Sequence, residues 1–248
     1  MLRRAALLLA TLVAAGCARA GDVQVAAASN LANTVQKIAA AFARDTGHRA
    51  VVSLGSTGKL HTQIRNGAPF EVLLAADEET PRRLVAEGLA REDTRFTYAI
   101  GRLVLWSAAE GVVDTRGEIL RQPPKGKLAI ADPRVAPYGA AAVATLQKMG
   151  VLQAWQPHLV QGESIGQAYQ FVASGNARIG FIALSQVAEL GRVARGSGWV
   201  VPPPLYPPLL QDAVLLNTGA ANPAAVAFLT YLRGNAARAI LRNAGYTF

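Results

Sequence analysis

The sequence predicts an α/β protein built of two lobes. Apolar runs typical of strands alternate with amphipathic segments typical of helices along most of the 248 residues. Strand–helix–strand–helix order at this spacing indicates parallel strands joined by right-handed crossovers. Two breaks, at Gly101-Arg102 and in the proline-rich segment 202–208, indicate that the chain crosses from one lobe to the other and back.

The N-terminus has the features of a secretory signal peptide. Arg3 and Arg4 precede the apolar run 5–16, which is too short to span a bilayer, and Ala18-Arg19-Ala20 offers an A-x-A cleavage site. We predict that residues 1–20 are removed and that the mature chain is periplasmic. Attachment of a lipid at Cys17 is the less favoured alternative, and no cysteine follows it.

The charge of the chain is basic but dispersed. Removing the leader takes away three arginines and no acid, which reduces the net charge from +9 to +6. Nucleic-acid binding requires a concentrated basic face, and the lysines and arginines here form no run. A general attraction for small anions is the more economical interpretation.

The first lobe is predicted to comprise residues 21–101 together with 212–248. Its central strand, 51–54, is apolar apart from one serine, so we expect both faces of the strand to be buried. Glycines at 47, 67 and 88 end the helices that follow the strands. The expected strands are 23–28, 51–54, 70–76 and 212–216, and the expected helices begin at Ser29-Asn30, after Ser56-Thr57 and at 77–79, with two more over 223–233 and 235–243.

The second lobe is predicted to comprise residues 102–211. Prolines bar a central strand over 202–208 and suit the return to the first lobe. The expected strands are 128–131, 158–160 and 179–184, and the expected helices are 140–149 and the segment from 162–166 to Val172.

Four strand-to-helix turns carry small or polar residues, and two belong to each lobe. Ligands of open α/β sheets bind beyond the carboxyl ends of the strands, where such turns lie. The start of a helix offers free N–H groups and a partial positive charge, which suit an anion. Lys59 is one turn inward, so a dianion would be held by six or seven neutral donors, each worth roughly 1.5–3 kcal/mol. The turns are Ser29-Asn30, Ser56-Thr57, Tyr138-Gly139 and Ser164-Ile165.

Other chemistries fit the sequence less well. Gly58-Lys59 is not a P-loop, since Ser53 and Leu60 stand where Gly and Ser or Thr are required. The three histidines lack partners at metal-ligand spacing, so we expect surface or loop positions for them. Asp77 and Asp132 are expected to cap backbone groups, and no pattern indicates catalysis.

Five motifs in order along the mature chain resemble the periplasmic molybdate-binding proteins of ABC importers. They are AAASN, GSTGKL, ADP with APYG, ESIGQAYQFVASG and GFIALSQ. The resemblance implies a two-lobed type II periplasmic-binding fold with a mostly parallel sheet in each lobe. It implies a monomer that binds molybdate or tungstate, has no cofactor, and delivers its ligand to a membrane permease. The implied contacts are Ser29, Asn30, Ser56 or Thr57, and the N–H groups of Tyr138 and Ile165.

One departure and three alternatives remain open. Some family members have a tyrosine where this chain has Ala183, and Asn30 is expected to replace that hydroxyl. A sulfate, phosphate or other small-anion binder of the same fold is the main alternative. The others are an exported hydrolase that uses Ser56 and a cytoplasmic effector-sensing domain, which the leader opposes.

Overall fold

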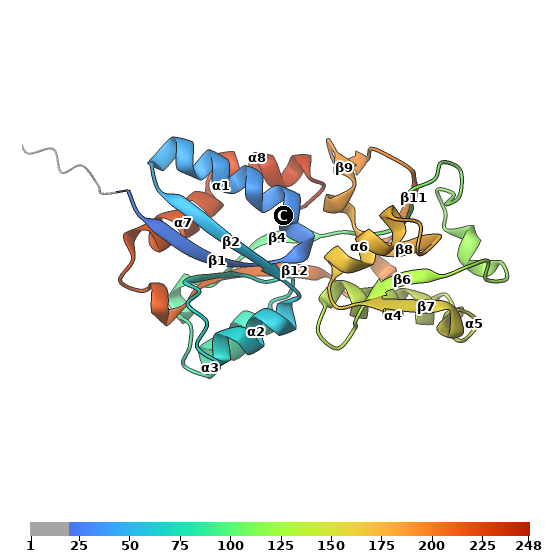
Figure 1. The fold of residues 1–248 in the computed structure, drawn as a ribbon, viewed down its shortest axis with the longest axis horizontal. Helices are drawn as coiled ribbons and strands as arrows, with labels where there is room; N and C mark the ends of the chain where they lie inside the picture. The colour runs from blue at the N-terminus through green and yellow to red at the C-terminus, as the bar shows by residue number, and fades with distance from the viewer. Residues whose placement is uncertain (1–19) are drawn as a thin grey trace, which may run out of the picture.

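The computed structural model describes residues 20–248 and shows two α/β lobes side by side (Figure 1). The five-stranded sheet of the first lobe has the order β2-β1-β3-β12-β4, and that of the second has the order β11-β5-β8-β6-β7. The predicted fold class is therefore confirmed. Residues 1–19, which include most of the predicted signal peptide and Cys17, lie outside the described residues. Within 20–248, no helix is both long and apolar enough to cross a membrane.

The first sheet is covered by helices on both faces. On one face, α1, α7 and α8 pack against Val23, Val25 and Ala27 of β1, and on the other α2 and α3 pack around Ala26. This alternation follows from the two-residue period of a strand. The elements are β1 (Asp22–Ala28), α1 (Ala32–Thr46), β2 (Arg49–Gly55), α2 (Thr57–Arg65), β3 (Val72–Leu74), α3 (Glu79–Ala86), β4 (Phe96–Gly101), β12 (Leu209–Leu215), α7 (Pro223–Arg233) and α8 (Asn235–Asn243).

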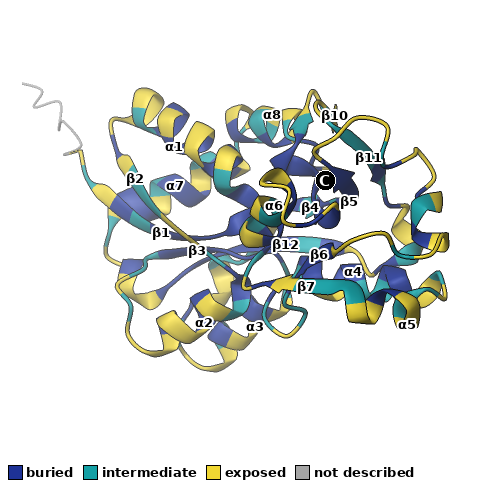
Figure 2. Ribbon diagram, turned by 45° about the vertical axis from the view of Figure 1, so that its right-hand side comes forward, coloured by how far each residue is buried: buried dark blue, intermediate teal, exposed yellow. Residues whose placement is uncertain are grey.

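The second sheet lies between α4 and α6. Leu128 and Ile130 of β6 face the α4 side, while Ala129 faces the α6 side. Buried residues form four clusters, one on each face of each sheet, and the cluster on the α4 side of the second sheet also includes Ala28 and Ala76 of the first lobe (Figure 2). The elements are β5 (Leu103–Ser107), β6 (Leu128–Ala131), α4 (Pro137–Lys148), α5 (Leu152–Trp155), β7 (Leu159–Gly162), α6 (Ile165–Ala173), β8 (Ile179–Ala183), the hairpin β9 (Ala188–Glu189) and β10 (Arg192–Val193), and β11 (Ser197–Val200).

Two details differ from the expectations. The strand β2 is not buried on both faces, because it lies at the edge of its sheet and leaves Leu54 46% exposed. Each sheet is mixed, with two parallel and two antiparallel ladders. The antiparallel ladders all involve β5 or β12, the strands on which the chain enters the second lobe and returns to the first.

The lobes are joined where the chain crosses between the sheets. The first crossing runs from β4 through Arg102 directly into β5. The second runs from β11 through the proline-rich segment into β12, whose first residue, Leu209, already pairs with Gly101. The pairing of β12 with the first sheet thus begins at Leu209.

Candidate functional site

The starts of helices from both lobes meet at one small cavity. All six residues predicted to contact a ligand line it, because each follows the carboxyl end of a strand. The cavity has a volume of about 10 Å³. Its lining consists of Ala28, Ser29, Asn30, Gly55, Ser56, Thr57, Ala76, Ala136, Pro137, Tyr138 and Ile165.

Ser56 stands out among these residues. It is the N-cap of α2 and is 3% exposed, yet its side chain makes no capping bond. Its Oγ is buried and has no hydrogen-bond partner in the described chain. Buried polar groups are almost always bonded, so this exception calls for an explanation, and its position in the cavity makes Ser56 a candidate ligand donor.

The neighbouring Thr57 has a different role. Its Oγ1 accepts a hydrogen bond of 3.1 Å from the N–H of Ala76, at the end of the segment that follows β3. This bond ties the start of α2 to the adjacent strand end. The two hydroxyls differ in that Thr57 has a protein partner whereas Ser56 has none within the described residues, although the Thr57 hydroxyl still keeps its own hydrogen for a further acceptor.

Ser29 is engaged from the opposite lobe. Its Oγ accepts a bond of 3.2 Å from the N–H of Gly166, in the first turn of α6. A hydroxyl that accepts in this way keeps its own hydrogen for a further acceptor. Ser29 therefore connects the lobes and still has a donor to offer.

The side chain of Asn30 has no donor left for a ligand. Its Nδ2 donates to Gln211 Oε1 at 3.0 Å and to the Tyr246 hydroxyl at 2.8 Å, so the amide hydrogens have protein acceptors. Its Oδ1 has no hydrogen-bond partner within the described residues. The backbone N–H, within the short 3₁₀ turn Ser29–Leu31, is the donor left for a ligand.

The second lobe contributes backbone donors. Pro137 occupies the first position of α4 and has no N–H, so the first available N–H of that helix belongs to Tyr138. In α6, Ser164 caps the N–H of Gln167 at 3.3 Å, and the N–H of Ile165 opens the helix. Both helix starts therefore direct N–H groups toward the cavity.

Lys59, the basic residue closest in sequence to the Ser56-Thr57 turn, is paired across the lobes. Lys59 pairs with Glu163 of the other lobe, and the two side chains are 48% and 72% exposed. Beside this pair, the N–H of Gly58 donates to the Val135 carbonyl at 2.9 Å, also across the lobes. The residues that line the cavity include no lysine and no arginine.

Several buried polar residues behind the cavity were not predicted. Gln211, Tyr98, Tyr246 and Ser185 form hydrogen bonds with each other or with Asn30. Burial raises the pKa of Tyr98 and of Tyr138 well above the ordinary value, so both phenols stay neutral. The one signal in the sequence was the polar pair Gln211-Asp212 inside an apolar segment. Ser185 lies in the GFIALSQ motif but was given no role there, and nothing local marked Tyr246.

The remaining candidate groups have structural roles. His61 is buried in α2, 3.2 Å from Glu87, so the expectation of a surface or loop histidine is wrong for it. Asp77 and Asp132 accept bonds from the N–H groups of Thr80 and Arg134, as expected for caps. No cluster of three metal-ligating side chains occurs in residues 20–248.

A cavity between two α/β lobes, lined by helix N-termini, is the arrangement of a solute-binding protein. A model of the family described as bacterial extracellular solute-binding protein matches residues 23–247, and the chain belongs to this family. It is 52% identical to the molybdate-binding protein ModA of Azotobacter vinelandii, over 92% of this chain and 91% of the relative. It is 48% identical to ModA of Rhodobacter capsulatus, over 92% and 89%.

Solved structures show the same similarity. The periplasmic molybdate-binding protein of Azotobacter vinelandii superposes with a TM-score of 0.87 and 41% identity, covering 91% of this chain and 99% of that one. The sulfate-binding protein SubI of Mycobacterium tuberculosis gives a TM-score of 0.71 at 17% identity, covering 91% and 86%. At that identity the second match concerns the fold alone.

Proposed function

We propose that this protein captures molybdate, or tungstate, between its lobes and delivers it to an ABC importer in the membrane. The observation that carries the proposal is the buried Ser56 hydroxyl without a partner, among helix starts from both lobes. Support also comes from two relatives, at 52% and 48% identity, that are named molybdate-binding proteins. The protein acts in the periplasm as a monomer and performs no catalysis.

The proposed contacts follow from which donors are free. Ser29 and Ser56 donate through their hydroxyls, and Asn30, Tyr138 and Ile165 donate through backbone N–H groups. Thr57 positions the strand end beside them and, like Ser29, keeps its hydroxyl hydrogen for a further acceptor. A fully charged anion is costly to bury unless it is thoroughly hydrogen-bonded, and this set surrounds it from two sides. We draw the lobe boundary after Gly101 and before Leu209.

Size is expected to set the selectivity. Molybdate, tungstate and sulfate are all tetrahedral dianions near neutral pH, so charge does not distinguish them. Donors held by helix ends form a cavity of set dimensions, and the smaller sulfate leaves some donors out of reach. Phosphate that carries a proton presents a donor to a site made of donors.

The test is a calorimetric titration with molybdate, tungstate, sulfate and phosphate. We expect molybdate and tungstate to bind similarly and sulfate to bind at least about a hundredfold more weakly, roughly 2.7 kcal/mol. Sulfate affinity within tenfold of molybdate would instead assign the protein to the sulfate binders. Turnover of an ester substrate would reinstate the hydrolase alternative.

A further inference from the structure

Gln211 makes hydrogen bonds to elements of both lobes. It lies on β12, where the chain returns to the first lobe, and it is fully buried. Its Oε1 accepts from Asn30 Nδ2 at 3.0 Å and from the Tyr98 hydroxyl at 2.9 Å, although that hydroxyl shares its one hydrogen with the Ala75 carbonyl, also at 2.9 Å. Its Nε2 donates to the Tyr138 hydroxyl at 3.0 Å. One amide thus joins the helix starts that carry two of the proposed ligand contacts.

An irregularity of the sheet orients this group. The pairing of β12 with β4 shifts between Gln211 and Asp212, so that Gln211 opposes Ala99, Asp212 opposes Thr97, and Tyr98 has no opposite residue. Such a bulge re-aims side chains and often lies beside a functional site. Here it lets the Tyr98 hydroxyl reach Gln211.

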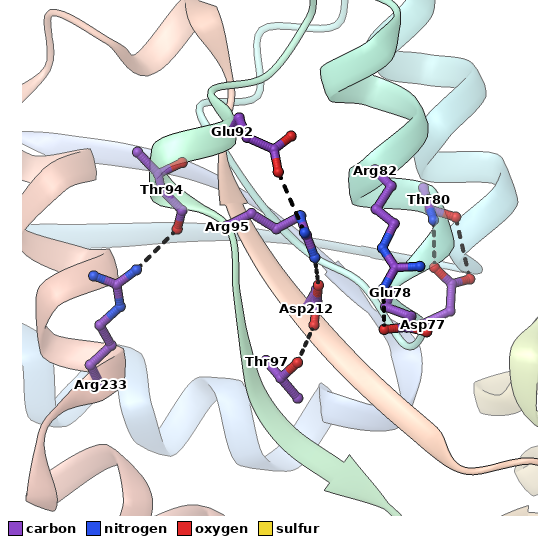
Figure 3. A network of polar contacts seen from close by, with 10 residues as sticks. All are labelled: Asp77, Glu78, Thr80, Arg82, Glu92, Thr94, Arg95, Thr97, Asp212 and Arg233. Atoms are coloured by element: carbon purple, nitrogen blue, oxygen red, sulfur yellow. Dashed lines mark hydrogen bonds and ion pairs between the residues drawn. The ribbon is translucent and has the colours of Figure 1, made fainter.

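The opposite face of β12 is anchored independently. Asp212 is buried and accepts bonds from Arg95 at 2.7 Å and from the Thr97 hydroxyl at 2.6 Å (Figure 3). Because neighbouring residues of a strand point to opposite faces, this anchor holds β12 while Gln211 points toward the site.

The first crossing leaves room for the amide. A Cβ on Gly101 would lie 2.3 Å from Gln211 Nε2 and 2.3 Å from the Tyr138 hydroxyl, which is too close for any side chain. The glycine is therefore required for space. Both strands that connect the lobes thus contribute to the Gln211–Tyr138 contact.

We propose that Gln211 is a positioning residue of the oxyanion site. It holds Asn30 of the first lobe and Tyr138 of the second together, so that their N–H groups meet on one ligand. Gln211 does not line the cavity and acts only through these two residues. Its bonds to Asn30 and Tyr98 lie within the first lobe, whereas its bond to Tyr138 forms when the lobes close.

The inference rests on the proposed function and is tested with Gln211→Met and Tyr138→Phe. The first keeps the length of the side chain without hydrogen-bonding groups, and the second removes only the hydroxyl and keeps the backbone N–H. We expect each single variant to bind molybdate about tenfold more weakly than the unaltered protein. The affinity of the double variant should be at most twofold lower than that of the weaker-binding single variant. This non-additivity is expected because both changes remove the same bond.

The matched control is Thr145→Val on the same helix as Tyr138. Its hydroxyl is fully buried and donates only to the Ala141 carbonyl, at 2.9 Å. We expect molybdate affinity within twofold of the unaltered protein. A merely structural role for Gln211 would lower the free energy of unfolding without coupling to Tyr138 in binding.

Two results would overturn the proposal. One is molybdate affinity within twofold of the unaltered protein for either single variant, and the other is full additivity in the double variant. If Gln211→Met fails to fold, Tyr138→Phe decides alone, and molybdate affinity within twofold of the unaltered protein then overturns the proposal. Failure of the proposed function is recognised separately, because the unaltered protein would then not bind molybdate. In that case the variants are titrated with whichever oxyanion the unaltered protein binds.

Discussion

Replacing Ser56 by alanine separates ligand binding from folding more cleanly than other changes in the cavity. The Ser56 Oγ is buried without a partner, so its removal breaks no hydrogen bond within the described protein. Deleting an unsatisfied buried polar group costs little and can even stabilise a fold. We therefore expect the ligand-free free energy of unfolding to stay unchanged or to rise.

The effect on binding is expected to be large. A hydrogen bond to a charged group contributes about 1.5–3 kcal/mol, and the oxyanion would lose one such bond. This corresponds to a decrease in molybdate affinity of roughly 10- to 150-fold. No other donor can move into the place of the lost Ser56 hydroxyl, because the remaining donors are held by helix starts and by cross-lobe bonds.

The assay combines calorimetric titration with urea unfolding in the absence of ligand, and Thr57→Val is the matched variant. Valine keeps the shape of threonine but removes the oxygen that accepts from the Ala76 N–H. An unpaired buried N–H costs about 1–3 kcal/mol, so this variant should lose stability without ligand. If Ser56→Ala binds molybdate as tightly as the unaltered protein, the assignment of Ser56 as a ligand donor is refuted.

Three further results are expected. Solution scattering should show a smaller radius of gyration when molybdate is added, since the donors are divided between lobes joined at Gly101 and Leu209. An unchanged radius at saturation would contradict hinge closure. Lys59→Ala should weaken molybdate binding by less than about 1 kcal/mol, because Glu163, the partner of Lys59, is exposed. Abolished binding would contradict a site of neutral donors. Stability in urea should decrease above about pH 10, the ordinary tyrosine pKa, because burial raises the folded-state pKa of Tyr98, Tyr138, Tyr206, Tyr231 and Tyr246. Above that pH the unfolded chain loses protons that the folded chain keeps. Tyr138→Phe should make this alkaline decrease less steep, and an equally steep decrease would show that the Tyr138 phenol does not contribute.

Local signals in the sequence were sufficient for most elements. The sequence predicted the helices Pro223–Arg233 and Asn235–Asn243, and the structure confirms both ranges. The left-handed Gly47 ends α1 as expected, with a φ of 78°. These features depend on neighbouring residues only, which is why a single sequence reveals them.

Other features depend on residues far apart in the chain. The edge position of β2 could not be inferred, because a short apolar run looks the same in a central strand and in an edge strand. The commitment of the Asn30 amide to Gln211 and Tyr246 joins residues 181 and 216 positions away. The distinction between Ser56 and Thr57 likewise depends on the Ala76 N–H, which is adjacent only in the folded chain.

Neutral donors and a basic surface have complementary roles in the function proposed here. The mature chain carries an expected charge of +6, spread over the surface, which attracts any small anion at long range. A lysine inside the cavity would adapt its flexible stem to anions of several sizes. Lys59 is instead paired across the lobes, and the lining donors belong to helix starts whose positions are set by packing and by bonds such as that of Gln211 to Tyr138. The surface charge therefore attracts the anion. The distances between the donors, which are set only when the lobes close, discriminate among tetrahedral dianions.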